Sequence, residues 1–241
     1  MKQYERSELK VLQEGRFLRL CEISYQPVLG DLTSPSKPKV KGVGGRKWEM
    51  SQRTTRQVPL ELYRRTPVPF AIDSVEICAF LRRSEETSLI LVAQYRPPLD
   101  ALVLEFPAGL IDPGENVRSA ALRELKEETG YAATEEDITS VTDPLCYEPG
   151  LTDSCGEFVR ILVDGDKKEN HNPKQQLDDG EDIEVILLPI HSKKSDAEGD
   201  TPLQALEKLL KGKYDTQRRI IIDARLYMFL DGLSLTRAMR W

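Results

Sequence analysis

The most restrictive feature of the sequence is a segment near its middle that carries both a start and a stop signal for a helix. Asn116 is a good N-cap residue, and Gly130 stands where a left-handed C-cap is expected. Between them, Ala120 and Leu125 belong to an apolar stripe with helical spacing. We therefore predict a helix over residues 117–129 with one face toward a core.

Strand-like runs flank this helix on both sides. Short runs rich in β-branched or aromatic residues, separated by turn or charged residues, are typical of strands. The first two such runs enclose a loop rich in Pro and Gly and predict a long-looped β-hairpin. The predicted strands are residues 17–25, 46–56, 70–81, 88–95, 101–106, 138–146, 157–163, 183–188 and 219–222.

The remaining segments complete an α+β fold class. Two more helices are expected at 202–211 and 224–239, and the polar residues 165–180 predict an exposed loop of a kind that is often functional or mobile. A chain of 241 residues has room for one domain with an elaboration. We expect an N-terminal β extension over 1–65 and the main domain over 66–241.

Composition and charge exclude several classes of protein. Hydrophobic residues make up 39% of the chain, which is enough for a core, and charged residues 31%. The 34 basic and 40 acidic residues give a net charge of −6, the wrong sign for general adhesion to nucleic acid or anionic lipid. Without a signal peptide or a membrane-spanning run, the expected compartment is the cytoplasm or the nucleus. The 4 cysteines form no CxxC pair, so we expect free thiols.

Acidic residues of the predicted helix lie on its inward face. At 100° per residue, Glu124 and Glu128 fall about 20° to either side of Val117, in line with the alanines. They are like charges four residues apart, and Glu128 lies in the last turn, where the helix dipole disfavours anions. A hard divalent cation with oxygen ligands would compensate such a pair. We infer a Mg²⁺ site, with Mn²⁺ as the substitute ion.

The alternative is an ordinary charged helix held by an Arg123–Glu127 pair. The wider spacing separates the two interpretations: Gly109, five residues, Glu115, seven residues, then Arg123-Glu124-Leu125-Lys126-Glu127-Glu128-Thr129-Gly130-Tyr131. Every fixed position resembles the Nudix box, G-x5-E-x7-R-E-U-x-E-E-x-G-U, with Tyr131 in place of the usual aliphatic residue.

The resemblance to Nudix hydrolases implies an αβα sandwich that cleaves a nucleoside diphosphate linked to another group. It implies that Glu124 and Glu128 are metal ligands and that Glu127 binds a further ion or orients water. The carbonyl of Ala108 is also a ligand in the relatives that this chain resembles. Glu127 and Arg123 count among the expected catalytic residues.

Two further roles complete the expected catalytic machinery. Glu115 is expected to hold the loop and Arg123 in place. The general base must come from elsewhere, because a metal-bound carboxylate is a poor proton acceptor. The resemblance to ADP-ribose pyrophosphatases favours Glu181, with a solvated acidic turn as the alternative. The candidates for the base are Asp178, Asp179, Glu181 and Asp182.

Other stretches resemble the eukaryotic ADP-ribose pyrophosphatase branch: Arg46-Lys47-Trp48-Glu49, Arg53-Thr54-Thr55-Arg56, Gln94-Tyr95-Arg96-Pro97-Pro98 and Leu104-Glu105-Phe106-Pro107-Ala108-Gly109. The branch uses an aromatic pair to sandwich adenine, and it usually has tryptophan where this chain has Phe17. Guanidinium groups suit a diphosphate, although a structural ion pair is the alternative for each arginine. The expected substrate-binding residues are Phe17, Trp48, Arg53, Arg96, Glu148 and Leu151.

The branch also forms homodimers whose N-terminal strands cross to the partner, which implies that residues 1–65 serve dimerisation and base stacking at shared sites. The leading hypothesis is Mg²⁺-dependent hydrolysis of ADP-ribose to AMP and ribose 5-phosphate. Other ADP-sugars and oxidised nucleoside diphosphates such as 8-oxo-dGDP stay open as substrates, and a non-catalytic nucleotide-binding module is the weaker alternative. Histidine-based catalysis is weaker still, because His171 and His191 lie in no recognisable motif.

Overall fold

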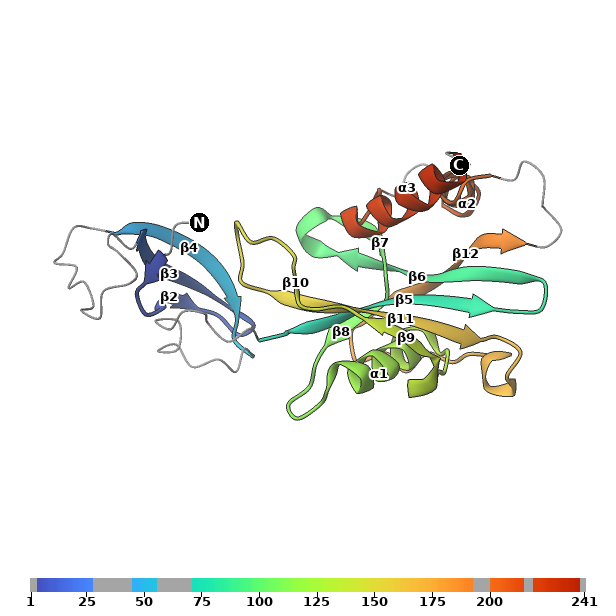
Figure 1. Ribbon diagram of the computed structural model, residues 1–241, viewed down its shortest axis with the longest axis horizontal. Helices are drawn as coiled ribbons and strands as arrows, with labels where there is room; N and C mark the ends of the chain where they lie inside the picture. Colours follow the sequence, from blue (N-terminus) through green and yellow to red (C-terminus); the bar gives the residue numbers. More distant parts are fainter. Residues whose placement is uncertain (1–3, 28–44, 56–70, 193–199, 215–218, 239–241) are drawn as a thin grey trace, which may run out of the picture. The chain divides into compact units, whose positions relative to one another are not determined.

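The computed structural model describes residues 4–27, 45–55, 71–192, 200–214 and 219–238. The chain divides into two compact units (Figure 1). The first contains the chain up to Asp73 together with Pro144–Gly156, and the second contains Ser74–Asp143 and the chain from Glu157 onward. The expected boundary at residue 65 lies outside the described residues, and the first unit also includes the later segment Pro144–Gly156.

The first unit is built on a four-stranded antiparallel sheet. Strand β3 (Leu18–Pro27) pairs with β1 (Tyr4–Arg6), β2 (Lys10–Glu14) and β4 (Arg46–Arg53). The antiparallel pairing of β3 with β4 confirms the predicted hairpin. A small core of Leu9, Cys21, Ile23 and Met50 supports it.

A larger, mixed sheet has the main strand order β10-β11-β5-β6-β7-β13, with β12 on β6, β8 on β5 and β9 on β11. Its strands belong to the second unit, except that β10 and the first two residues of β11 belong to the first. Strand β13 pairs with β7 in parallel, whereas the pairs β10–β11, β9–β11, β12–β6, β5–β6, β5–β8 and β6–β7 are antiparallel. The strands are β5 (Ser74–Arg82), β6 (Glu86–Arg96), β7 (Ala101–Glu105), β8 (Ala108–Leu110), β9 (Ile138–Val141), β10 (Leu145–Cys146), β11 (Cys155–Asp164), β12 (Ile183–Ser192) and β13 (Ile220–Ile222).

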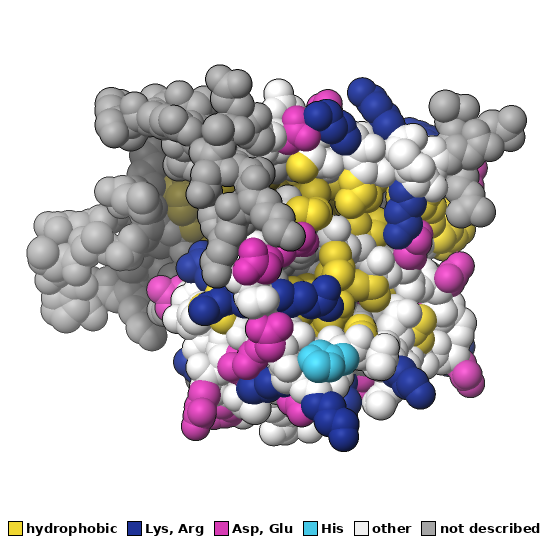
Figure 2. All heavy atoms as spheres, turned by 90° about the vertical axis from the view of Figure 1, so that its right-hand side faces the viewer, with side chains coloured by type: hydrophobic (Ala, Val, Ile, Leu, Met, Phe, Trp, Pro, Cys, Tyr) yellow, Lys and Arg dark blue, Asp and Glu magenta, His cyan; other side chains and the backbone are white. Residues whose placement is uncertain are grey.

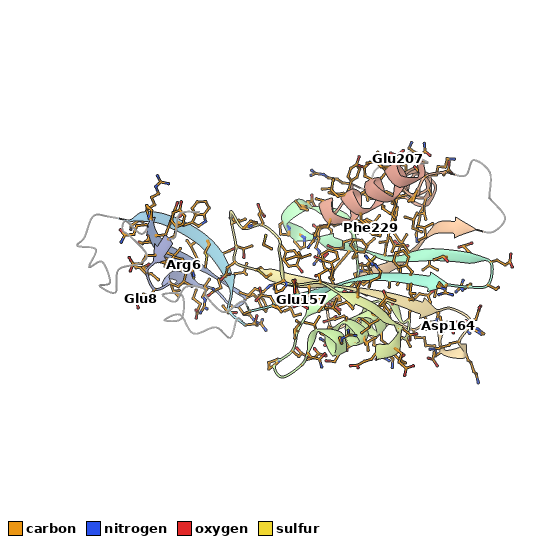
Figure 3. All side chains as sticks on the ribbon, viewed as in Figure 1. Arg6, Glu8, Glu157, Asp164, Glu207 and Phe229 are labelled. Atoms are coloured by element: carbon orange, nitrogen blue, oxygen red, sulfur yellow. The ribbon has the colours of Figure 1, made fainter. Side chains whose placement is uncertain are left out.

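Helices cover both faces of this sheet, as the αβα prediction requires (Figure 1). Helix α1 (Val117–Thr129) packs on one face, where Ile77, Leu125 and Ile161 belong to one core. Helices α2 (Pro202–Lys213) and α3 (Ala224–Ala238) pack on the other. There Phe229 of α3, labelled in Figure 3, meets Phe106 with their ring centroids 5.6 Å apart.

Helix α1 begins and ends where the sequence predicts. The Asn116 side chain accepts hydrogen bonds from the backbone N–H groups of Arg118 and Ser119, at 2.9 and 3.0 Å. Gly130 adopts the left-handed conformation with a φ of 76°, and its N–H donates to the carbonyl of Lys126. Tyr131 packs in the core of this face.

One prediction about local structure is wrong, and another holds for most of its residues but not for all. Residues 138–146 form two strands rather than one, because the chain turns at Thr142 and Asp143 and Pro144 cannot donate to a ladder. The polar segment 165–180 is not simply an exposed loop. Asn170 is fully buried, and its amide donates to the carbonyls of Ala132 and Asp164.

The surface of the second unit is rich in charge of both signs. Figure 2 shows acidic and basic side chains interspersed among apolar ones on the face it presents. All four cysteines are free, as expected. None of the helices in the described ranges has the length and apolar character needed to cross a membrane.

Replacing Gly130 by alanine should destabilise the fold more than the same change at Gly114. Both glycines have positive φ, 76° and 86°, so each substitution incurs a backbone cost of about 1 kcal/mol. A Cβ at Gly130 would also stand 2.4 Å from the backbone nitrogen of Lys174, whereas at Gly114 it would meet nothing within 4 Å. We expect Gly130→Ala to cost about 1–3 kcal/mol more in the free energy of unfolding, measured in urea. Equal losses would contradict this.

Candidate active site

Glu128 is the most buried carboxylate of the helix. Its exposed fraction is 8%, and one oxygen, Oε2, accepts a hydrogen bond of 3.0 Å from the backbone N–H of Ala108. Burial, together with the negative charges of Glu124, Glu181 and Glu105, raises the pKa of Glu128 to about 8. Three other carboxylates therefore contribute negative charge at Glu128.

Glu124 lies one turn earlier, directly over the backbone of Gly109. A Cβ at Gly109 would stand 1.8 Å from the carboxyl carbon of Glu124, so any larger residue would displace this carboxylate. Burial raises the pKa of Glu124, and Glu127 and Glu181 contribute in the same direction. The box therefore needs glycine at position 109, because the Glu124 carboxylate occupies the space that a side chain would take.

Arg123 forms hydrogen bonds with three glutamates of the box. Its Nε and Nη2 donate to the two oxygens of Glu115 at 3.1 and 2.8 Å, and its Nη1 donates to Glu124 at 2.8 Å and to Glu127 at 2.9 Å. These bonds raise the pKa of Arg123, and the bond to Arg123 lowers the pKa of Glu115. The expected contact between Glu115 and Arg123 is therefore present, and Glu115 also accepts from the N–H of Asp112.

The donor set suits a hard divalent cation. Glu124 and Glu128 supply carboxylate oxygens on one helix face, and burial followed by the charge of Glu124 raises the pKa of Glu128. Within the described ranges, no three His, Cys, Asp or Glu side chains form a preformed metal cage. Mg²⁺ needs only one or two carboxylates from a protein, because it usually retains several waters. Glu124 and Glu128, with the carbonyl of Ala108, would hold it.

The acidic loop before β12 also acts on the carboxylates of α1. Glu181 adds negative charge at both Glu124 and Glu128. It sits in a turn in which its carboxylate accepts from the N–H of Asp178 at 3.1 Å and Gly180 has a φ of 90°. Of the four candidates for the base, Glu181 is thus the one that influences the pKa of both helix carboxylates.

One buried carboxylate received no role from the sequence. Glu105 is 9% exposed, burial raises its pKa, and it adds to the negative charge around Glu128. Nε and Nη2 of Arg96 bind its Oε1, so the ion pair considered for Arg96 exists. The sequence signal for it was a glutamate within the apolar predicted strand 101–106, because a charged residue is rarely buried unless it is paired.

The other expected substrate residues belong to the first unit. Phe17 and Trp48 are exposed by 67% and 43%, and Leu18, the first residue of β3, pairs with Arg53. Leu151 is exposed, and its carbonyl accepts from the N–H of Ser51 on β4 at 2.9 Å.

The carbonyl of Glu148 accepts from the N–H groups of Leu151 and Thr152 and so closes a turn. Arg56 lies outside the described residues.

Metal-free protein should lose stability as pH rises. The pKa of Glu128 is about 8 in the folded chain against a reference value of 4.5, so folding favours its protonated form. This stabilisation is complete below the unfolded pKa and is lost as pH rises through about 8. With chelator present, we expect the melting temperature to fall more steeply over this range than in Glu128→Gln, whose amide stays neutral. Parallel melting-temperature profiles for the two proteins would refute the assignment.

The sequence is similar to a known protein family and to several known proteins. Residues 74–206 match the model of the NUDIX domain family. The chain is 37% identical over 221 residues to an uncharacterised Nudix hydrolase of Schizosaccharomyces pombe, covering 92% of this chain and 87% of that one. It is 31% identical to the ADP-sugar pyrophosphatase of Mus musculus, covering 95% and 86%. It is 36% identical to the ADP-ribose pyrophosphatase of Saccharomyces cerevisiae, covering 61% and 58%.

Nudix hydrolases generally need a divalent metal, and the carboxylates on α1 fit that requirement. The matched domain includes the whole box and the Glu181 loop, and it covers more than half of the chain. The chain belongs to the Nudix hydrolase family.

Proposed function

We propose that the protein hydrolyses the pyrophosphate bond of ADP-ribose, with Mg²⁺ as its metal and Mn²⁺ as a substitute, to give AMP and ribose 5-phosphate. The observation that carries this proposal is the buried carboxylate of Glu128 beside the partly buried carboxylate of Glu124 on one helix face, both within electrostatic reach of Glu181. In hydrolysis, water adds to one phosphorus, the bridging P–O bond breaks, and the bridging oxygen leaves with the other phosphate.

Each residue has a defined task in this reaction. A bound divalent ion would neutralise phosphate charge and favour ionisation of water. Glu124 and Glu128 would hold it, and Glu181 would take the proton of the attacking water as general base. Arg123 keeps Glu124 and Glu127 in place through its hydrogen bonds of 2.8 and 2.9 Å.

The printed names of the relatives support a nucleotide-sugar substrate. The mouse relative is an ADP-sugar pyrophosphatase and the budding-yeast relative an ADP-ribose pyrophosphatase. Other ADP-sugars or oxidised nucleoside diphosphates would require the same carboxylates, so the box does not rank them. A module that only binds nucleotide is disfavoured, because Arg123, Glu124, Glu127 and Glu128 are all present.

The test is turnover of ADP-ribose with Mg²⁺, with and without chelator, with products resolved by chromatography. We expect AMP and ribose 5-phosphate, and we expect Glu124→Gln to lower the rate by at least about 100-fold. Glu136→Gln, which changes an exposed carboxylate outside the box, serves as the control and should retain the wild-type rate. Turnover that persists in chelator, or a fully active Glu124→Gln, would overturn the proposal.

We further propose a homodimer in which the N-terminal strands complete the partner's site. In the β3–β4 register Trp48 lies opposite Ile23, while Phe17 precedes Leu18. Six residues along a strand place the two rings roughly 20 Å apart. A base needs its two stacking partners only about 7 Å apart, one van der Waals contact on each face. Phe17 and Trp48 of one chain therefore suit two different sites.

Removal of residues 1–56 should abolish both dimerisation and turnover. Light scattering and the ADP-ribose assay measure these outcomes. The matched control is the double variant Phe17→Ala, Trp48→Ala, which keeps the strands: it should remain dimeric and show a KM raised about tenfold or more, from loss of stacking. A monomeric but fully active truncated protein would refute the shared site.

A further inference from the structure

The last turn of α1 is bound by a segment far away in the sequence. The terminal carbonyls of a helix have no partner within the helix and need donors from elsewhere. The N–H of Gln176 donates to the carbonyl of Glu127 at 2.8 Å, and Nε2 of Gln175 donates to the carbonyl of Glu128 at 2.6 Å. The two residues expected to contact metal and water are thus held through their backbones by adjacent glutamines.

Gln175 makes a second hydrogen bond with the same amide group. Its Nε2 also donates to the carbonyl of Ile183, the first residue of β12, at 2.9 Å. The side-chain amide of Gln175 therefore links the end of α1 to the start of β12 through two hydrogen bonds. Residues 176–182 form a loop whose two ends are closed by this single group.

Further contacts hold the segment before Gln175 against the residues that follow α1. The backbone at Pro173 and Lys174 approaches Gly130 so closely that a Cβ there would lie 2.4–2.7 Å from its atoms. The buried amide of Asn170 accepts from the N–H of Ala132 at 2.8 Å and donates to its carbonyl at 3.0 Å. The segment is therefore fixed up to Lys174, and the Gln175 side chain links this fixed part to β12.

Glu181 lies inside the closed loop, two residues before Ile183. The backbone of its turn is held by a hydrogen bond of 3.1 Å from the N–H of Glu181 to the carbonyl of Asp178. A general base must stand within hydrogen-bond reach of the water that it deprotonates, and misplacement by about 1 Å can cost 100-fold in rate.

We propose that Gln175 is a positioning residue that sets the distance between the Glu181 carboxylate and the carboxylates of α1, by bonding the carbonyls of Glu128 and Ile183 with one amide group. This inference rests on the proposed function, because it takes Glu181 as the base. A residue without two N–H donors, such as alanine, cannot bridge two carbonyls.

The test is a double-mutant cycle in the full-length protein. Gln175→Ala should lower kcat for ADP-ribose about tenfold and leave KM within about twofold, because the metal and substrate ligands are unchanged. In the Glu181→Gln background the same change should have almost no further effect on the residual rate, because the base that it positions is gone. Gln176→Ala is the matched control: it keeps the backbone donor and should match the wild type in both backgrounds.

A readout independent of activity accompanies the cycle. Amide hydrogen exchange of residues 177–182 should be faster in Gln175→Ala than in Gln176→Ala, with unchanged melting temperatures. Equal exchange would overturn the bridge even if the protein does not cleave ADP-ribose. An equal fold-loss of kcat in both backgrounds would overturn the positioning role, and full activity of Glu181→Gln would overturn both the base and the proposal.

Discussion

Burial of the Glu128 carboxylate is the constraint on which the arrangement of the second unit's active site depends. The group lies in the last turn of a helix, where the dipole disfavours an anion, and three other carboxylates add to its negative surroundings. One backbone N–H, from Ala108, partly offsets this cost. The fold therefore holds a site that is electrostatically unfavourable without a cation, and the tight packing around it keeps the carboxylates from moving apart.

That packing comes from three directions. The absence of a side chain at Gly109 leaves room for Glu124, Arg123 fixes the box loop through Glu115, and the segment 170–176 binds the carbonyls at the end of α1. Each contact joins residues that are distant in sequence or on different elements. The helix sets the direction of the carboxylates, whereas the loops around it set their spacing. Substitutions in these loops can therefore change the reaction rate while the residues of the box stay the same.

Local signals explain which features could be predicted from the sequence. Caps at Asn116 and Gly130 and a regular apolar stripe define α1 in any context, and the inward direction of Glu124 and Glu128 follows from the helix period alone. Strands β1 and β2 were missed because their residues are mostly exposed and carry little apolar alternation. The binding of 170–176 to α1 was missed because polar composition does not distinguish solvated side chains from those that satisfy backbone groups.

Arginine pairing distinguishes Glu76, Glu105 and Glu124 from Glu128. Arg225 binds Glu76, Arg96 binds Glu105, and Arg123 binds Glu124, so each of these glutamates has a permanent cation. Among the described residues, no basic side chain forms an ion pair with Glu128. A carboxylate as buried as the others would normally need such a partner, because an uncompensated buried charge is costly. Glu128 therefore stays protonated or acquires a cation from solution, and this choice couples the stability of the fold to the metal that its chemistry requires.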